Sequence, residues 1–204
     1  MKRLLLFICI LTFAGCSSFP SKKIVEEKYF LSDAPQAESY ESMKKKLSVG
    51  VNMVGAGYSA EVYPLTRPLI VAEEAEAGKK NLDSTEVVQQ KTKARIDAFS
   101  KDRTCFSITI DTYDIETAKF TNWRAKLSSN GDALQELQFL NTKGVQSVPT
   151  PFKDFNGRDW HNNSLLCSSK VIDLRHPIKI ILIPQFETNL GSDANAELSW
   201  EIKK

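Results

Sequence analysis

Apolar residues recur at every second position in several stretches of this chain beyond residue 104. Phe106, Ile108 and Ile110 alternate with polar residues, and the same alternation returns in the final stretch, 196–202. A period of two buries one face of a strand and leaves the other face in water, as is typical of antiparallel sheets. This half of the chain is therefore expected to form an antiparallel β-domain.

Further strands are expected at 47–53, 58–65, 121–127, 133–140, 160–168 and 178–183. The last of these is an apolar run closed by Pro184, which predicts a central strand buried on both faces. Asn130-Gly131 lies between two alternating stretches and predicts a hairpin, because both residues accept positive φ. Trp123 and Trp200 lie in the apolar phase of their strands, so we expect them in the core rather than in a carbohydrate-stacking platform.

Two helical stretches precede most of these strands. Pro68 could begin a short helix that reaches Ala77 and stops at Gly78. Capping-box residues and apolar residues at helical spacing predict the main helix near 84–101. Helices followed by a run of strands predict a mainly β fold, namely an antiparallel β-sandwich with an appended N-terminal helical segment.

The first residues have the layout of an export signal. Lys2 and Arg3 precede an apolar run at 4–13, and the small residues Ala14 and Gly15 follow it. Ten residues rise only about 15 Å as a helix, roughly half of a bilayer core, so a removable signal is favoured over a transmembrane anchor. One interpretation of this layout is an ordinary signal peptide.

Phe13-Ala14-Gly15-Cys16 resembles the lipobox of bacterial lipoproteins, with Phe13 where the family usually has an aliphatic residue. The resemblance implies that residues 1–15 are removed and that Cys16 carries lipid, which holds the protein on a membrane. Ser17 is similar to the pattern that Gram-negative bacteria carry on to the outer membrane. The resemblance therefore implies a lipid-anchored cell-envelope protein at the outer membrane, facing the periplasm or the cell surface.

The remaining chain divides into a tether and one domain. Residues 16–39 are mostly polar and are expected to form the tether, although the short apolar runs within 24–31 could instead dock on the domain. Residues 40–204 suffice for a single β-rich domain. The chain has 27 Lys plus Arg against 25 Asp plus Glu, and Lys2 and Arg3 leave with the signal, so the mature net charge is zero. Without a basic surplus, nucleic acid is not expected as a partner.

Two of the four cysteines remain for the folded part. Cys9 leaves with the signal and Cys16 would carry lipid, so Cys105 and Cys167 are left. In an oxidising envelope this pair predicts one disulfide, the alternative being two unrelated buried thiols. Cys105 is out of phase with the inward Phe106, so the bridge is expected at a sheet edge or on the outer face.

No residue is assigned a catalytic role, and no cofactor is expected. His161 and His176 are the only histidines, no Gly-x-Ser-x-Gly elbow accompanies them, and the ligands are too few for zinc. Asp111, Asp114 and Glu116 could offer oxygen ligands to Ca²⁺ where a strand enters a turn, with a solvated turn as the favoured alternative.

The expected function is non-enzymatic. We expect a lipid-anchored cell-envelope protein whose β-sandwich serves binding or structural support, with the membrane and another envelope protein as partners. One alternative is a lipid-anchored hydrolase with a site in the long, irregular 141–161 loop. A second is a subunit of a larger envelope or secretion assembly, which an exposed apolar patch would indicate.

Overall fold

The computed structural model describes residues 21–31, 38–140, 144–149, 158–186 and 194–203. The strands are β1 (Ser21–Glu26), β2 (Val49–Met53), β3 (Tyr58–Pro64), β4 (Cys105–Thr112), β5 (Trp123–Ser129), β6 (Gln135–Leu140), β7 (Gln146–Pro149), β8 (Arg158–Cys167), β9 (Ile178–Pro184) and β10 (Ala196–Lys203). The helices are α1 (Lys28–Leu31), α2 (Tyr40–Leu47), α3 (Arg67–Asn81), α4 (Thr85–Ile96) and α5 (Ile115–Ala118), with short helical turns η1 (Val54–Ala56), η2 (Asp97–Lys101) and η3 (Phe120–Asn122). Strand is the commoner element in the described part, so the prediction of a mainly β fold is confirmed.

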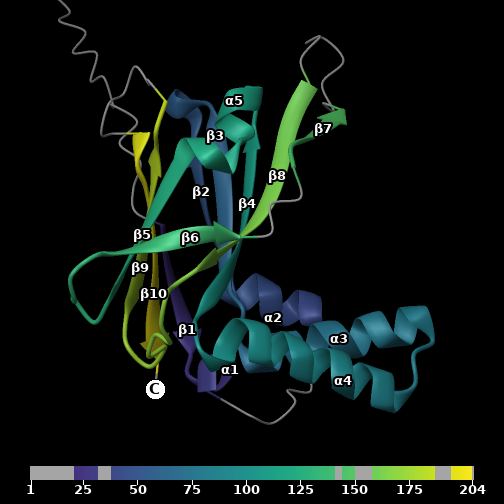
Figure 1. Cartoon of the computed structure of the whole chain (residues 1–204). Coiled ribbons are helices and arrows are strands. Elements are labelled where there is room, and N and C mark those ends of the chain that lie inside the picture. Colours follow the sequence, from purple (N-terminus) through teal and green to yellow (C-terminus); the bar gives the residue numbers. More distant parts are fainter. Residues whose placement is uncertain (1–20, 32–37, 141–143, 150–157, 187–193, 204) are drawn as a thin grey trace, which may run out of the picture.

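The strands form one nearly closed, barrel-like sheet (Figure 1). Their order is β1-β10-β9-β5-β6-β8-β4-β3-β2, with β7 beside β8. The first half of β6 pairs with β5 and the second half pairs with β8, so this strand joins the two halves of the sheet. At the other side, β10 and β1 pack against β2 and bring the ends of the sheet together.

Alternating side chains fill the interior of this barrel. In β10 the even-numbered residues from Ala196 to Trp200 are buried, whereas Glu197 and Ser199 lie on the outer face. β9 shows the same alternation, and its odd-numbered residues are only half-buried. The expectation that this strand is buried on both faces is therefore wrong, because only its inner face packs on the core.

Two buried aromatic side chains close the seam where the ends of the sheet meet. The indole Nε1 of Trp200 donates a hydrogen bond to the backbone carbonyl of Leu47 at 2.7 Å. The hydroxyl of Tyr58 donates to the backbone carbonyl of Ala194 at 2.6 Å, and burial raises the pKa of Tyr58, which keeps this donor protonated. Trp123 is buried as well, so the prediction that it and Trp200 belong to the core is confirmed.

The helices α3 and α4 form a hairpin at the lower end of the barrel in Figure 1. α3 continues past Gly78 to Asn81, beyond the end predicted for it. A Cβ atom at Gly78 would lie 2.3 Å from Cγ2 of Val88, so this glycine allows the two helices to approach each other. α4 continues into η2, which confirms the helix predicted near 84–101.

Residues 21–31, expected within the 16–39 tether, belong to the folded domain. β1 pairs in parallel with β10. Val25, Tyr29 and Phe30 are buried in the main core. The tether expectation is wrong for this segment, because its short apolar runs supply core side chains, as the docking alternative proposed.

Other predicted segments lie wholly or partly outside the described residues. The signal at 1–15 and the lipid-bearing Cys16 lie wholly outside them. Of the 141–161 loop, β7 and the start of β8 are described and pair with each other, so the expectation of irregular structure is wrong there. Within the described part of the chain, no helix is long and apolar enough to cross a membrane.

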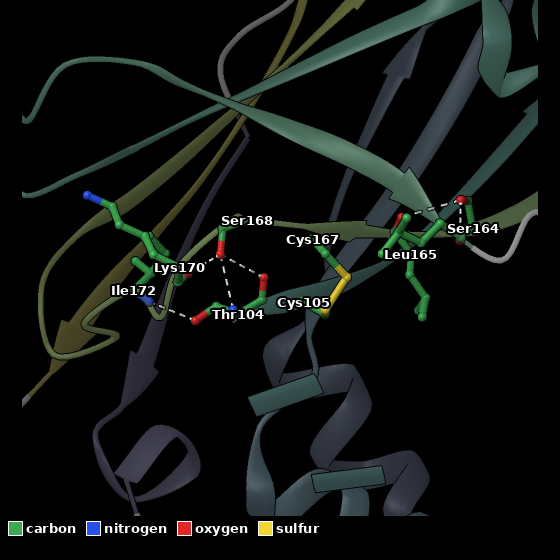
Figure 2. Close-up of a disulfide and its surroundings, with 9 residues drawn as sticks. Thr104, Cys105, Ser164, Leu165, Cys167, Ser168, Lys170 and Ile172 are labelled. Atoms are coloured by element: carbon green, nitrogen blue, oxygen red, sulfur yellow. Dashed lines mark hydrogen bonds between the residues drawn. A yellow bond between two sulfur atoms is a disulfide. The ribbon is translucent and has the colours of Figure 1, made fainter. Parts of the chain in front are cut away.

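Cys105 and Cys167 form a disulfide, as predicted (Figure 2). The two residues lie directly opposite each other in β4 and β8, with their Cα atoms 4.2 Å apart. The ladder continues beyond them, where the amide of Thr104 donates to Oγ of Ser168 at 3.1 Å. Both cysteines are buried against Ile70 of α3 on the outer face of the sheet. The bridge therefore joins neighbouring central strands under a helix, rather than clasping a sheet edge.

Candidate functional site

One row of polar residues crosses the outer face of β2, β3, β4, β8 and β7. The cross-strand register places each member directly opposite the next. The members, called the polar row below, are Asn52, Ser59, Asp111, His161 and Gln146. On β2, β3, β4 and β8 these residues alternate with buried ones, so their side chains point away from the core.

A chain of hydrogen bonds surrounds His161 on this face. The hydroxyl of Thr109 donates to Oδ1 of Asn163 at 2.6 Å, and the Asn163 amide contacts Nε2 of His161 at 2.8 Å. With Nε2 accepting, Nδ1 carries the proton and donates to the Asp111 carboxylate at 2.6 Å. An acid and an imidazole are thus paired, but an amide occupies the nitrogen that would accept a proton from a nucleophilic hydroxyl.

An open groove of 580 Å³ lies between α2 and the polar row. Its charged and polar lining comprises Glu41, Lys44, Lys45, Ser48, Asn52, Ser59, Glu61 and Asp111. A smaller hollow of 230 Å³ shares Asn52, Ser59 and Asp111 and adds Tyr113 and Asp159. Three acids and two lysines line the larger groove, so neither sign of charge dominates it.

Two buried oxygen atoms along these hollows have no hydrogen-bond partner among the described residues. One is the hydroxyl of Ser48 in the groove, and the other is Oδ1 of Asp159 in the smaller hollow. An unpaired buried polar group costs about 1–3 kcal/mol, so both atoms are candidate contacts for a bound molecule. The mixture of donors and acceptors, with three acids against two lysines in the larger groove, suits a polar ligand without a strong charge of its own.

The three acids considered for Ca²⁺ do not converge. Asp111 belongs to the polar row, whereas Oδ2 of Asp114 accepts the amide of Thr117 at 2.8 Å and caps α5. This backbone hydrogen bond lowers the pKa of Asp114. Glu116 pairs with Lys119. In the described part of the chain, no three His, Cys, Asp or Glu side chains are grouped so as to hold a metal ion.

His176 belongs to a different surface. It lines a hollow with Ser129 and Lys170, and its Nε2 lies 3.7 Å from Oδ2 of Asp173. Hydrogen bonds from the side chain and backbone of Arg175 hold the pKa of Asp173 well below its usual range. The fold therefore does not bring the two histidines together in one site.

Sequence reasoning missed Thr109 and Asn163 as partners of the Asp111–His161 pair. Alternation along each strand indicates that the members share a face, and this signal was available. The pairing of β4 with β8 across more than fifty residues could not be read from the sequence, because periodicity does not specify which strand is a strand's neighbour.

Comparisons of this chain with protein-family models, with curated proteins and with solved structures give no match.

Proposed function

We propose that this chain is a lipid-anchored cell-envelope protein that binds a polar ligand without catalysing its turnover. The observation that supports the location in the envelope is the buried Cys105–Cys167 disulfide, and the polar groove beside α2 supports binding. Disulfides form and persist in oxidising compartments outside the cytoplasm, to which the N-terminal signal would deliver the chain. The lipobox-like sequence ending at Cys16 supplies the anchor, and the outer membrane is the proposed location.

Metabolic labelling tests the anchor. Labelled palmitate should enter the wild-type protein and the Cys9→Ser variant, because Cys9 leaves with the signal, but not the Cys16→Ser variant. The mature N-terminus should also be chemically blocked. Equal labelling of Cys16→Ser and wild type would contradict lipidation at Cys16.

Binding is favoured over hydrolysis by the contacts of His161. Asn163 occupies its Nε2, so the arrangement supplies an acid and an imidazole without a hydroxyl nucleophile. The domain should therefore not react with a fluorophosphonate probe for activated serines. Labelling that disappears in His161→Gln would favour the alternative of a lipid-anchored hydrolase.

A subunit role in a larger envelope or secretion assembly is supported by one surface feature. Leu82 is 91% exposed where α3 ends, at the turn of the helical hairpin. A photo-crosslinker at Leu82 should capture an envelope protein if the hairpin is a docking element, whereas one at Gln89 on α4 is the matched control. Equal yields at both positions would contradict docking through this turn.

We also propose that the two halves of the barrel pack as the layers of a β-sandwich, with β6 shared. Aromatic contacts between the halves support this description. The rings of Tyr58 and Trp123 lie 4.8 Å apart, and those of Phe106 and Trp200 lie 5.9 Å apart.

A further inference from the structure

We propose that the end of the barrel that carries α5 rests on the lipid bilayer, with Tyr113 and Ile115 in contact with it. This inference depends on the proposed lipid at Cys16. It adds an orientation that lipidation alone does not specify.

The first argument is the shortness of the link to the anchor. β1 begins at Ser21, five residues after Cys16. Five residues span at most about 17 Å when fully extended. The domain therefore cannot stand far from the membrane, as it could if all of 16–39 were a tether.

The second argument is the direction in which the chain enters the barrel. β1 runs parallel to β10, from Ser21 opposite Leu198 to Glu26 opposite Lys203. The first residue of β1 is therefore directed toward the end of the barrel where β10 begins. The last residue of β1 is directed toward the opposite end, where α1 follows. Figure 1 shows α5 at the first of these ends and the α3–α4 hairpin at the opposite end.

Tyr58 links the start of β10 to the turn that holds Tyr113. Its hydroxyl binds the carbonyl of Ala194, just before β10, and its backbone lies opposite Thr112 in β4. Tyr113 follows Thr112 directly, so the anchor-proximal end of β10 and this exposed tyrosine are at the same end of the barrel.

The third argument is the chemistry of that end. Tyr113 is 77% exposed and Ile115 is 39% exposed. An aromatic ring with a polar tip is suited to the headgroup region of a bilayer. Three of the acids near this end are engaged locally, since Asp114 caps α5, Glu116 pairs with Lys119 and Asp111 pairs with His161, which reduces their repulsion of anionic lipid. Asp159 lies in the hollow beside Tyr113.

Nitroxide labels on the mature, lipidated protein test the orientation. Single labels would be placed at Tyr113→Cys and Ile115→Cys, with Leu82→Cys as the matched exposed control at the helical hairpin. Cys105 and Cys167 are bonded to each other and would not react with the label. The protein would be reconstituted into vesicles of phosphatidylethanolamine and phosphatidylglycerol, and electron paramagnetic resonance would measure label collisions with oxygen and with a water-soluble nickel chelate.

Labels at 113 and 115 should lose collisions with the nickel chelate and gain collisions with oxygen on reconstitution, while the label at 82 should remain exposed to the chelate. Full chelate access at 113 and 115, or loss of access at 82, would overturn the orientation. Mass spectrometry of the N-terminal peptide separates the two proposals. A lipidated Cys16 with water-exposed labels refutes the orientation alone, whereas an unmodified Cys16 refutes the anchor and the orientation with it.

Discussion

Trp200 illustrates how much single residues contribute to closing this barrel. Its ring is fully buried, and its one polar atom bonds the carbonyl of Leu47, just before β2. The seam between β10 and β2 lacks a ladder of backbone hydrogen bonds, so such contacts hold it together. The same residue therefore packs the core and satisfies the carbonyl of Leu47 at the C-terminal end of α2, where the helix supplies no further donor.

We predict that Trp200→Phe lowers the free energy of unfolding by about 1–3 kcal/mol or more, because the buried Leu47 carbonyl loses its donor. Urea denaturation measures this loss. Glu197→Gln, on the outer face of the same strand, is the control and should change stability by less than about 1 kcal/mol. Equal effects of the two substitutions would contradict the importance of the seam contact.

Glu38 gives stability a dependence on pH. Hydrogen bonds from Lys46, Tyr29 and Ser42 to its carboxylate lower its pKa from 4.5 to about 2. A carboxylate with a depressed folded-state pKa stabilises the fold above its unfolded value, and this contribution is lost as the pH falls through the folded value.

The stability gap between wild type and Glu38→Gln should therefore be full above pH 4.5 and should close as the pH falls toward 2. Urea midpoints across this range measure it. Lys46→Gln should reduce the same pH dependence, since the Lys46 ammonium is the largest cause of the shift. A gap that stays constant with pH would show that Glu38 does not act through its charge.

At the scale of elements, α3 and α4 depend on their close approach. Gly78 lies in the last turns of α3, where alanine would ordinarily stabilise a helix by about 1 kcal/mol. Here the added methyl would meet Cγ2 of Val88, a β-branched side chain with little rotamer freedom.

We predict that Gly78→Ala destabilises the wild-type domain but stabilises a Val88→Ala background, where the obstructing methyl groups are gone. A double-mutant cycle by urea denaturation gives the sign in each background. Gly50→Ala is the control for added bulk, because its nearest neighbour, the Ala60 carbonyl, lies at an ordinary contact distance of 3.7 Å. The same sign in both backgrounds would contradict a clash with Val88.

At the scale of the whole molecule, the N-terminal segment is part of the fold rather than an appendage. β1 pairs with β10, and Val25, Tyr29 and Phe30 enter the main core. Burying a Val or Phe side chain contributes about 1.5–3 kcal/mol each, which is a large share of a total of about 5–15 kcal/mol.

A mature domain that begins at Ser21 should therefore keep the urea midpoint of one that begins at Cys16. A domain that begins at Glu38 should unfold at much lower urea, because β10 loses its parallel neighbour and the core loses three side chains. Circular dichroism during denaturation compares the three proteins. Equal midpoints for all three would restore the interpretation of 16–39 as a tether.

The sequence alone determined the strands other than β1 and β7, the hairpin at Asn130-Gly131, the main helix and the disulfide pair. These features follow from local signals, namely period-two alternation, turn chemistry, helical spacing and the number of cysteines available. The sequence also indicated that Asp111 and Cys105 are on the outward phase of β4, since phase is fixed by position along the strand.

Only the tertiary structure decided which strands are neighbours. It placed Asp111 beside His161 and Cys105 opposite Cys167, and it brought residues 21–26 against β10. Strand pairing depends on long-range packing that alternation does not encode, because the same alternating pattern fits beside several partners. The polar row, the groove beside α2 and the short link to the anchor therefore became visible only when the sheet was assembled.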